Sequence, residues 1–180
     1  FSMINLKENK ISSAIIYQGR LLDVRRDQVR LPNGNTSTRE WIKHPGAVCM
    51  IPLLTDNKIA LIRQYRYPVQ KEMIELPAGK LDENEKPEVC AMRELEEEIG
   101  YVSQKLTFLT HIHPAIGFAD EMMWLYLAEN LIKTVSNQDE DEFLEIMPTP
   151  LEKALKMVWH GEITDAKTII GILWAERLLS

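Results

Sequence analysis

The chain has 180 residues, 45% of them hydrophobic, so it is long enough to bury one sizeable core. Its formal net charge of −6 argues against a general nucleic-acid-binding or membrane surface. Its two cysteines fit a reducing compartment, and no apolar run has the length of a membrane span or the pattern of a signal peptide, so we expect a cytoplasmic location.

Residues 11–44 have the pattern of short strands broken by turns. Gln18-Gly19 and Asn33-Gly34 are turn signals, and the second favours a hairpin that returns through residues 36–43. A meander of this size is too small to be stable in isolation. We therefore expect residues 1–44 to form a β-layer that packs on the main body or on a second copy of the chain, followed by a larger domain of residues 45–180.

Two apolar runs follow this layer. Residues 46–54, GAVCMIPLL, are almost continuously apolar and predict a central strand buried on both faces. A turn at residues 55–58 separates this run from residues 59–62, which predict a second buried strand running back.

The stretch that organises the chain is residues 79–101, GKLDENEKPEVCAMRELEEEIGY. Pro87 suits the first turn of a helix, because its missing N–H would be unpaired there, and Gly100 suits the stop. Between them an apolar stripe recurs at helical spacing, made of Ala91, Met92, Leu95 and Ile99.

Three carboxylates converge on one flank of this predicted helix. Glu94, Glu97 and Glu98 stand at positions i, i+3 and i+4, whereas Glu96 falls on the opposite flank. Each like-charge pair costs an isolated helix roughly 0.2–0.5 kcal/mol. A bound Mg²⁺ would reverse that penalty, because this cation takes oxygen ligands. The alternative for the three residues alone is a solvated acidic face.

After the helix, residues 106–112 and 121–128 predict two strands joined by a loop at residues 113–120. An acidic turn at residues 137–142 precedes a short strand at residues 143–147. Strands on either side of a helix, with more helices at the end, predict a sheet covered on both faces.

Two helices are expected near the end of the chain. Thr149-Pro150-Leu151-Glu152 has the pattern of a capping box with Pro150 at the first helical position. A final helix follows Asp165, and Trp174 is expected in its core-facing stripe.

Residues 79–101 match every fixed position of the Nudix box. The match consists of Gly79, five residues, Glu85, seven residues, Arg93-Glu94-Leu95, one residue, Glu97-Glu98, one residue and Gly100-Tyr101. A motif with two glycines and four acids at set offsets is a strong signal. The chain therefore resembles the Nudix hydrolases, which cleave a diphosphate linked to another moiety. This resemblance implies an α/β/α sandwich with a mixed sheet, preceded here by the small antiparallel β-layer.

Further segments resemble bacterial ADP-ribose pyrophosphatases, from about residue 16 to residue 173. They are Arg39-Glu40-Trp41, His44-Pro45-Gly46-Ala47-Val48, Arg63-Gln64-Tyr65-Arg66, residues 75–82 and Asp165-Ala166-Lys167-Thr168. This resemblance implies hydrolysis of ADP-ribose to AMP and ribose 5-phosphate. It also implies Mg²⁺, with Mn²⁺ as a substitute, and a homodimer that exchanges the N-terminal β-layer.

The resemblance suggests metal ligands in and beside the box. Glu94 and Glu98 are expected to bind metal, with Glu97 bridging a second ion and the Ala78 carbonyl as a backbone ligand. Arg93 is expected to orient the glutamates, because an always-charged fork beside them holds their geometry. Glu85, at the junction of loop and helix, is expected to hydrogen-bond the loop backbone rather than serve as an outer ligand.

Diphosphate hydrolysis also needs an activated water, and glutamates committed to metal are poor bases. Glu142 resembles the loop glutamate that approaches the metals in this family, and Glu140 is the neighbouring candidate. The alternative for both is an exposed acidic turn.

Four residues are candidates for substrate binding. Arg39 and Arg66 would grip the diphosphate or the terminal ribose through a planar fork, with a surface salt bridge as the alternative for each. Trp41 would stack on adenine across the dimer, with ordinary sheet packing as the alternative. Gly117 lies in a loop that is longer than in the resembled enzymes and lacks their serine.

Two other functions stay open. Another Nudix substrate such as GDP-mannose is compatible with the box, because the box handles the diphosphate and not the attached group. A nucleotide-binding regulator without turnover would be expected to lose box glutamates or to carry an added DNA-binding domain, and the sequence shows neither.

Overall fold

The computed structural model describes residues 4–135 and 143–179. These residues form two compact units. The first contains the described residues up to His44 together with Ala115–Glu121, and the second contains the described residues of Pro45–Pro114 and Met122–Ser180. None of the helices in these ranges is both long and apolar enough to cross a membrane.

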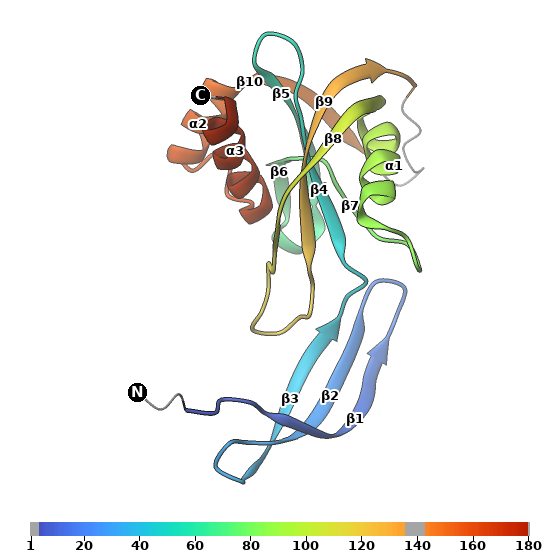
Figure 1. The fold of residues 1–180 in the computed structure, drawn as a ribbon, viewed down its shortest axis with the longest axis vertical. Helices are drawn as coiled ribbons and strands as arrows, with labels where there is room; N and C mark the ends of the chain where they lie inside the picture. The colour runs from blue at the N-terminus through green and yellow to red at the C-terminus, as the bar shows by residue number, and fades with distance from the viewer. Residues whose placement is uncertain (1–3, 136–142, 180) are drawn as a thin grey trace. The chain divides into compact units, whose positions relative to one another are not determined.

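The first unit is a three-stranded antiparallel sheet in the order β1-β2-β3 (Figure 1). Its strands are β1 (Asn9–Gln18), β2 (Asp23–Arg30) and β3 (Thr36–Lys43). The Gly19 N–H donates to the Leu22 carbonyl at 2.8 Å in the first connection. Gly34 has a φ of +87° in the second, where a glycine is favoured. Both predicted turns are therefore confirmed.

A loop from later in the chain extends this unit. The Ile42 N–H donates to the Phe118 carbonyl at 2.8 Å, and the Asp120 N–H donates to the Ile42 carbonyl at 3.2 Å. The Asp120 carboxylate accepts the N–H of His44 at 2.7 Å. Residues 115–121 are thus joined to the end of β3 by hydrogen bonds.

The second unit is built from a four-stranded and a three-stranded sheet, in the orders β7-β4-β9-β8 and β10-β5-β6. The strands are β4 (Ala47–Pro52), β5 (Lys58–Arg66), β6 (Lys71–Glu75), β7 (Ala78–Lys80), β8 (Tyr101–Ile112), β9 (Met123–Lys133) and β10 (Leu144–Pro150). Strands β4 and β9 pair in parallel, while the other neighbours are antiparallel. The unit is therefore mixed in strand direction.

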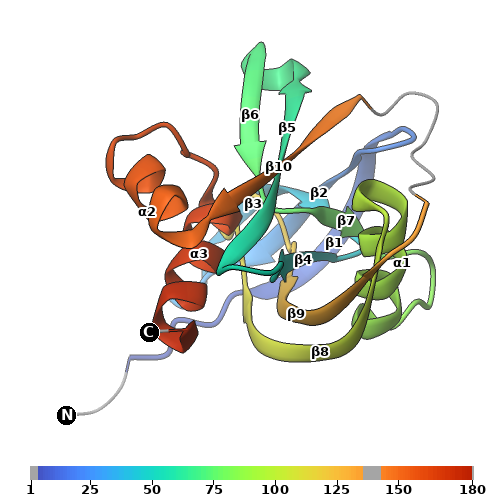
Figure 2. The same cartoon turned by 90° about the horizontal axis from the view of Figure 1, so that it is seen from above.

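Helices cover both sides of the four-stranded sheet. Helix α1 (Pro87–Ile99) lies on one side, and helices α2 (Leu151–Trp159) and α3 (Ala166–Leu179) lie on the other (Figures 1 and 2). A short 3₁₀ helix, η1 (Tyr67–Val69), connects β5 to β6.

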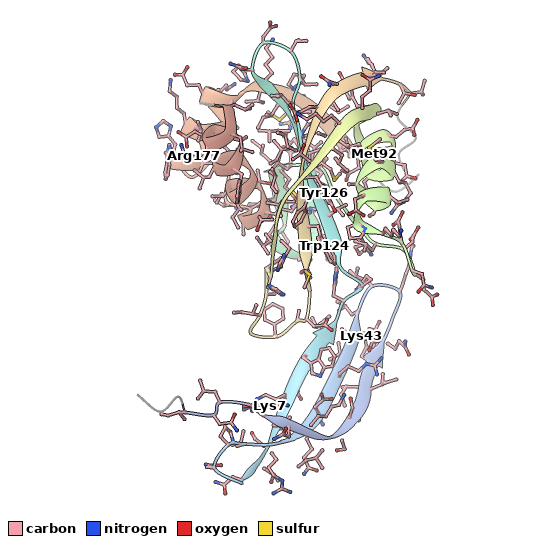
Figure 3. The ribbon with its side chains drawn as sticks, viewed as in Figure 1. Lys7, Lys43, Met92, Trp124, Tyr126 and Arg177 are labelled. Carbon is pink, nitrogen blue, oxygen red and sulfur yellow. The ribbon has the colours of Figure 1, made fainter. Side chains whose placement is uncertain are left out.

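Strand β4 separates two hydrophobic cores. All six of its residues are buried, as the apolar run predicts. Because side chains alternate along a strand, Val48 and Met50 face the α1 core, whereas Cys49 and Ile51 face the α2–α3 core. Tyr126 of β9, marked in Figure 3, belongs to the α1 core.

The capping-box prediction was wrong. Helix α2 begins at Leu151, and its N-cap is Pro150, which makes no side-chain cap. Thr149 instead continues the β10 ladder opposite Ile59, and its hydroxyl donates to the Met147 carbonyl at 2.9 Å. The strand therefore uses the residue that the local pattern assigned to the helix.

The core position predicted for Trp174 was also wrong, since this residue is 36% exposed. Helix α3 faces the core through smaller residues, among them Gly171 and Ala175. A β-carbon on Gly171 would lie 2.4 Å from Leu76 Cδ1 and 3.3 Å from Ile51 Cγ1. The close approach of α3 to the strands therefore requires the glycine.

Candidate active site

The glutamates of the box are presented by α1, whose limits match the prediction. Pro87 begins the helix, and Gly100 ends it with a φ of +66°. The buried side of α1 contains Ala91, Leu95 and Ile99, while Glu96 is exposed. Burying this side leaves the acidic flank beside the adjoining strand β7.

Arg93 is the centre of the carboxylate cluster. Its Nη1 donates to Glu94 Oε1 at 2.8 Å and to Glu97 Oε2 at 2.9 Å. Its Nε and Nη2 bind the two oxygens of Glu85 at 3.0 and 2.8 Å. The hydrogen bond with Glu85 is the main reason why the Arg93 pKa is raised. One guanidinium thus links three carboxylates that would otherwise repel one another.

Glu85 ties this cluster to the loop before the helix. Its carboxylate also accepts the N–H of Asp82 at 3.0 Å, so the predicted hydrogen bond to the loop backbone is confirmed. The hydrogen bond from Arg93 is the largest of the effects that lower the Glu85 pKa to about 2.

Glu98 and Glu94 reach the backbone of β7. Glu98 is 5% exposed, and its Oε2 accepts the N–H of Ala78 at 3.0 Å. A β-carbon on Gly79 would lie 1.9 Å from Glu94 Cδ. The Glu94 carboxylate therefore occupies the space that any other residue at position 79 would fill.

The donor chemistry of these residues fits a hard divalent cation. Glu94, Glu97, Glu98 and the Ala78 carbonyl supply oxygen atoms alone, which is the preference of Mg²⁺. The absence of a side chain on Gly79 leaves room for the carboxylate beside the backbone. Within residues 4–135 and 143–179, no three His, Cys, Asp or Glu side chains form a ready-made metal cluster. The metal roles of these residues stay predictions.

A second ionic cluster surrounds Glu75, which is 3% exposed. Arg66 donates from Nε to Oε1 at 2.7 Å and from Nη2 to Oε2 at 2.9 Å, and Lys167 donates to Oε2. Burial alone would raise the Glu75 pKa, but Arg66 and Lys167 outweigh it, and the pKa is lowered. Sequence reasoning assigned no role to Glu75 or Lys167. The sequence signal for Glu75 was its position, as a charged residue directly before the apolar Leu76-Pro77-Ala78.

The two clusters influence each other electrostatically. The Arg66 pKa is raised mainly by its hydrogen bond with Glu75, and the Glu98 carboxylate adds to the effect. The Arg66 side chain is 44% exposed, so it combines a buried carboxylate partner with access to solvent.

The other substrate-binding candidates lie in the first unit. Arg39 donates to the Glu8 carboxylate from Nε at 3.0 Å and from Nη2 at 2.5 Å. Trp41 is half-buried in β3, and Gly117 is exposed with open space around its α-carbon. Both candidate arginines thus make ion pairs, and substrate binding by any of the four residues stays a prediction.

Glu140 and Glu142, the two candidates for the general base, lie outside the described residues. Their assignment stays a prediction.

Comparisons with known proteins show the family of the chain. A model of the NUDIX domain matches residues 43–168, and a model of the nucleoside diphosphate sugar hydrolase N-terminal domain matches residues 8–42. The chain belongs to the Nudix family of hydrolases, as one of its pyrophosphatases. Enzymes of this family generally depend on a divalent metal.

Individual relatives match over nearly the whole chain. The chain is 43% identical over 176 residues to an ADP-ribose pyrophosphatase from Bacillus subtilis (strain 168). The aligned residues make up 97% of this chain and 95% of the relative. This chain is 41% identical over 172 residues to a methanol dehydrogenase activator from Bacillus methanolicus, covering 94% and 93%. A crystal structure of an ADP compounds hydrolase has a TM-score of 0.85 at 23% identity, covering 96% and 94%. The predicted fold class, a Nudix fold preceded by a small antiparallel sheet, is confirmed.

Proposed function

We propose that the protein hydrolyses the diphosphate bond of ADP-ribose, or of a closely related nucleoside diphosphate sugar, to AMP and ribose 5-phosphate. The proposed reaction is supported mainly by the close approach of Glu94 and Glu98 to the backbone of Ala78 and Gly79. The choice of substrate is supported by the relative named as an ADP-ribose pyrophosphatase, because the similarity includes the N-terminal unit as well as the box.

In this proposal, the α1 carboxylates and the Ala78 carbonyl bind Mg²⁺, and Mn²⁺ can substitute for it. When bound, the metal would lower the pKa of a water and neutralise the diphosphate. Arg93 holds Glu94 and Glu97 at fixed positions, and the Ala78 N–H holds Glu98. Such outer contacts preorganise ligands and so reduce the cost of binding.

A general base is still required, because carboxylates committed to a cation accept protons poorly. Glu142 is proposed for this role and Glu140 as its alternative, on the family resemblance. Arg66 is proposed to bind phosphate oxygens. Its guanidinium is already oriented by the buried Glu75, so little side-chain freedom is lost on binding.

We also propose a homodimer formed through the N-terminal sheet, with Arg39, Trp41 and Gly117 completing the substrate site. All ten residues of β1 are exposed, among them Ile15 at 53% and Tyr17 at 57%. An apolar strand edge of this kind invites pairing with another chain. Light scattering should give twice the mass of one chain, and Ile15→Lys should shift the equilibrium to monomer. A monomeric wild-type protein would contradict the dimer.

The substrate is tested by incubating the protein with Mg²⁺ and ADP-ribose, GDP-mannose and a dinucleotide, each in a separate reaction. We expect ADP-ribose to be cleaved fastest, to AMP and ribose 5-phosphate. Hydrolysis in ¹⁸O-labelled water then shows which phosphorus is attacked. Faster cleavage of GDP-mannose would retain the reaction but reject the substrate.

A further inference from the structure

We propose that Thr168, supported by Asp165 and Lys167, is a positioning residue that fixes the segment of residues 76–78, which leads from β6 into β7, and thereby the Ala78–Glu98 pair. The inference rests on the proposed role of Ala78 and Glu98 in holding a divalent cation. It assigns a function to the first turn of α3, which is far from the box in the sequence.

Each residue of segment 76–78 makes a backbone hydrogen bond to a different element. The Leu76 N–H donates to Thr168 Oγ1 of α3 at 2.8 Å. The Pro77 carbonyl accepts the N–H of Met50, in β4, at 2.9 Å. The Ala78 N–H donates to Glu98 Oε2 of α1 at 3.0 Å. Thr168 is thus the contribution of α3 to a chain of contacts that ends at a proposed metal ligand.

The Thr168 hydroxyl has a defined direction. It donates to Asp165 Oδ2 at 2.6 Å, which leaves its lone pair for the Leu76 N–H. The same Asp165 oxygen accepts the Thr168 N–H at 3.0 Å, as an N-cap residue does at a helix start. Thr168 is fully buried, so water does not replace these contacts.

Lys167, in the same first turn of α3, binds Glu75, the residue directly before segment 76–78. Its Nζ binds Asp165 Oδ2 at 3.0 Å and also binds the Glu75 carboxylate. The Lys167 side chain is 11% exposed and the Glu75 side chain 3%. A buried ion pair with several hydrogen bonds fixes geometry, because breaking either partner leaves an uncompensated charge.

The packing leaves segment 76–78 little room to move. Leu76 is fully buried, and Gly171, one helical turn after Thr168, lies directly against its side chain. Removing the Thr168 hydroxyl leaves the Leu76 N–H without its partner in a dry environment. The backbone must then move to recover a hydrogen bond, and Ala78 lies only two residues away.

The test compares Thr168→Val with Thr168→Ser, which restores the hydroxyl. Thr149→Val is the matched control, because Thr149 is also buried and its hydroxyl also makes a hydrogen bond to the backbone, donating to the Met147 carbonyl in β10. Three quantities are measured for each variant: Mn²⁺ affinity of the free protein by electron paramagnetic resonance, amide hydrogen exchange at Leu76 and Ala78, and kcat and KM for ADP-ribose.

We expect Thr168→Val to weaken Mn²⁺ binding by about tenfold, as loss of an outer contact commonly does. Its kcat should fall while its KM changes little, and exchange should accelerate at both Leu76 and Ala78. Thr168→Ser and Thr149→Val should keep the Mn²⁺ affinity and the Ala78 protection of the wild type.

Two results would overturn the inference in different ways. If the wild-type protein cleaves ADP-ribose and binds Mn²⁺, but Thr168→Val matches Thr149→Val in affinity and Ala78 exchange, Thr168 is only a structural residue and the proposed function survives. If the wild-type protein binds no Mn²⁺, the proposed metal role fails and the inference fails with it.

Discussion

Gly79 and Glu94 share one space: a β-carbon on the glycine would lie 1.9 Å from the carboxylate carbon of the glutamate. Gly79→Ala must therefore displace Glu94. We expect kcat for diphosphate hydrolysis to fall roughly 100-fold, because small displacements of a positioning group have effects of this size. The fold should persist, since the glutamate side chain can rotate away, and circular dichroism with steady-state kinetics checks both statements.

Gly161→Ala is the matched control for this substitution. Gly161 follows α2 with a φ of +74° and has nothing within 4 Å of a built β-carbon. Alanine there should lower the free energy of unfolding by about 1 kcal/mol through backbone strain and leave kcat unchanged. If the two glycine variants lose activity equally, the contact with Glu94 is not what matters.

Glu98 and Glu96 offer a second comparison, on one helix. Glu98 is buried and binds the Ala78 N–H, whereas Glu96 is exposed on the other flank. Glu98→Gln should lower kcat at least about 100-fold, because a neutral amide binds Mg²⁺ more weakly than the carboxylate and the cation neutralises the diphosphate. Glu96→Gln should be nearly silent. Equal losses in a Mg²⁺-dependent assay would contradict the placement of the acidic flank.

Arg93→Lys tests the link between the carboxylates. Lysine keeps the charge, but its three donors sit on one compact nitrogen and not on an extended planar fork, so it cannot span Glu85, Glu94 and Glu97 as Arg93 does. We expect Mn²⁺ affinity and kcat to fall about 10- to 100-fold, the range usual for outer contacts of a metal site. Arg177→Lys, at an exposed position late in α3, is the control and should behave as the wild type.

The depressed pKa of Glu85 predicts a pH dependence of stability. Its pKa is about 2 in the folded protein, and an unperturbed glutamate has a value of about 4.3. The stabilisation from ionised Glu85 is therefore complete above about pH 4.3 and is lost as the pH falls through 2. Urea unfolding of Glu85→Gln should show a deficit at pH 7 that shrinks towards pH 2.

Arg93→Met provides the control for this titration, because Arg93 is the main cause of the shift. In that background, Glu85→Gln should change the free energy of unfolding far less at pH 7. An undiminished effect would mean that the Asp82 backbone, and not Arg93, stabilises the ionised carboxylate.

Local signals predicted the parts of the fold that depend on neighbouring residues. Pro87 and Gly100 set the limits of α1, and Gly34 set the hairpin turn, because backbone preference alone decides these positions. The buried strands β4 and β5 followed from unbroken apolar runs.

Contacts between distant residues could not be predicted in this way. Glu75 and Lys167 are 92 residues apart, and no local pattern pairs them. Thr149 has the sequence of a helix cap, but its strand pairing with Ile59 takes precedence. The exposure of Trp174 and the close fit of Gly171 against Leu76 both depend on tertiary packing.

The hydrogen bond from the Leu76 N–H to Thr168 also sets an order for biosynthesis. A ribosome completes the Nudix box and every proposed ligand of the cation long before it adds residue 168. A nascent chain arrested at residue 160 would contain all of these proposed ligands but would lack the hydrogen bond from α3 to segment 76–78. Under the proposed role of Thr168, the backbone beside these ligands would be fixed only after α3 has been translated.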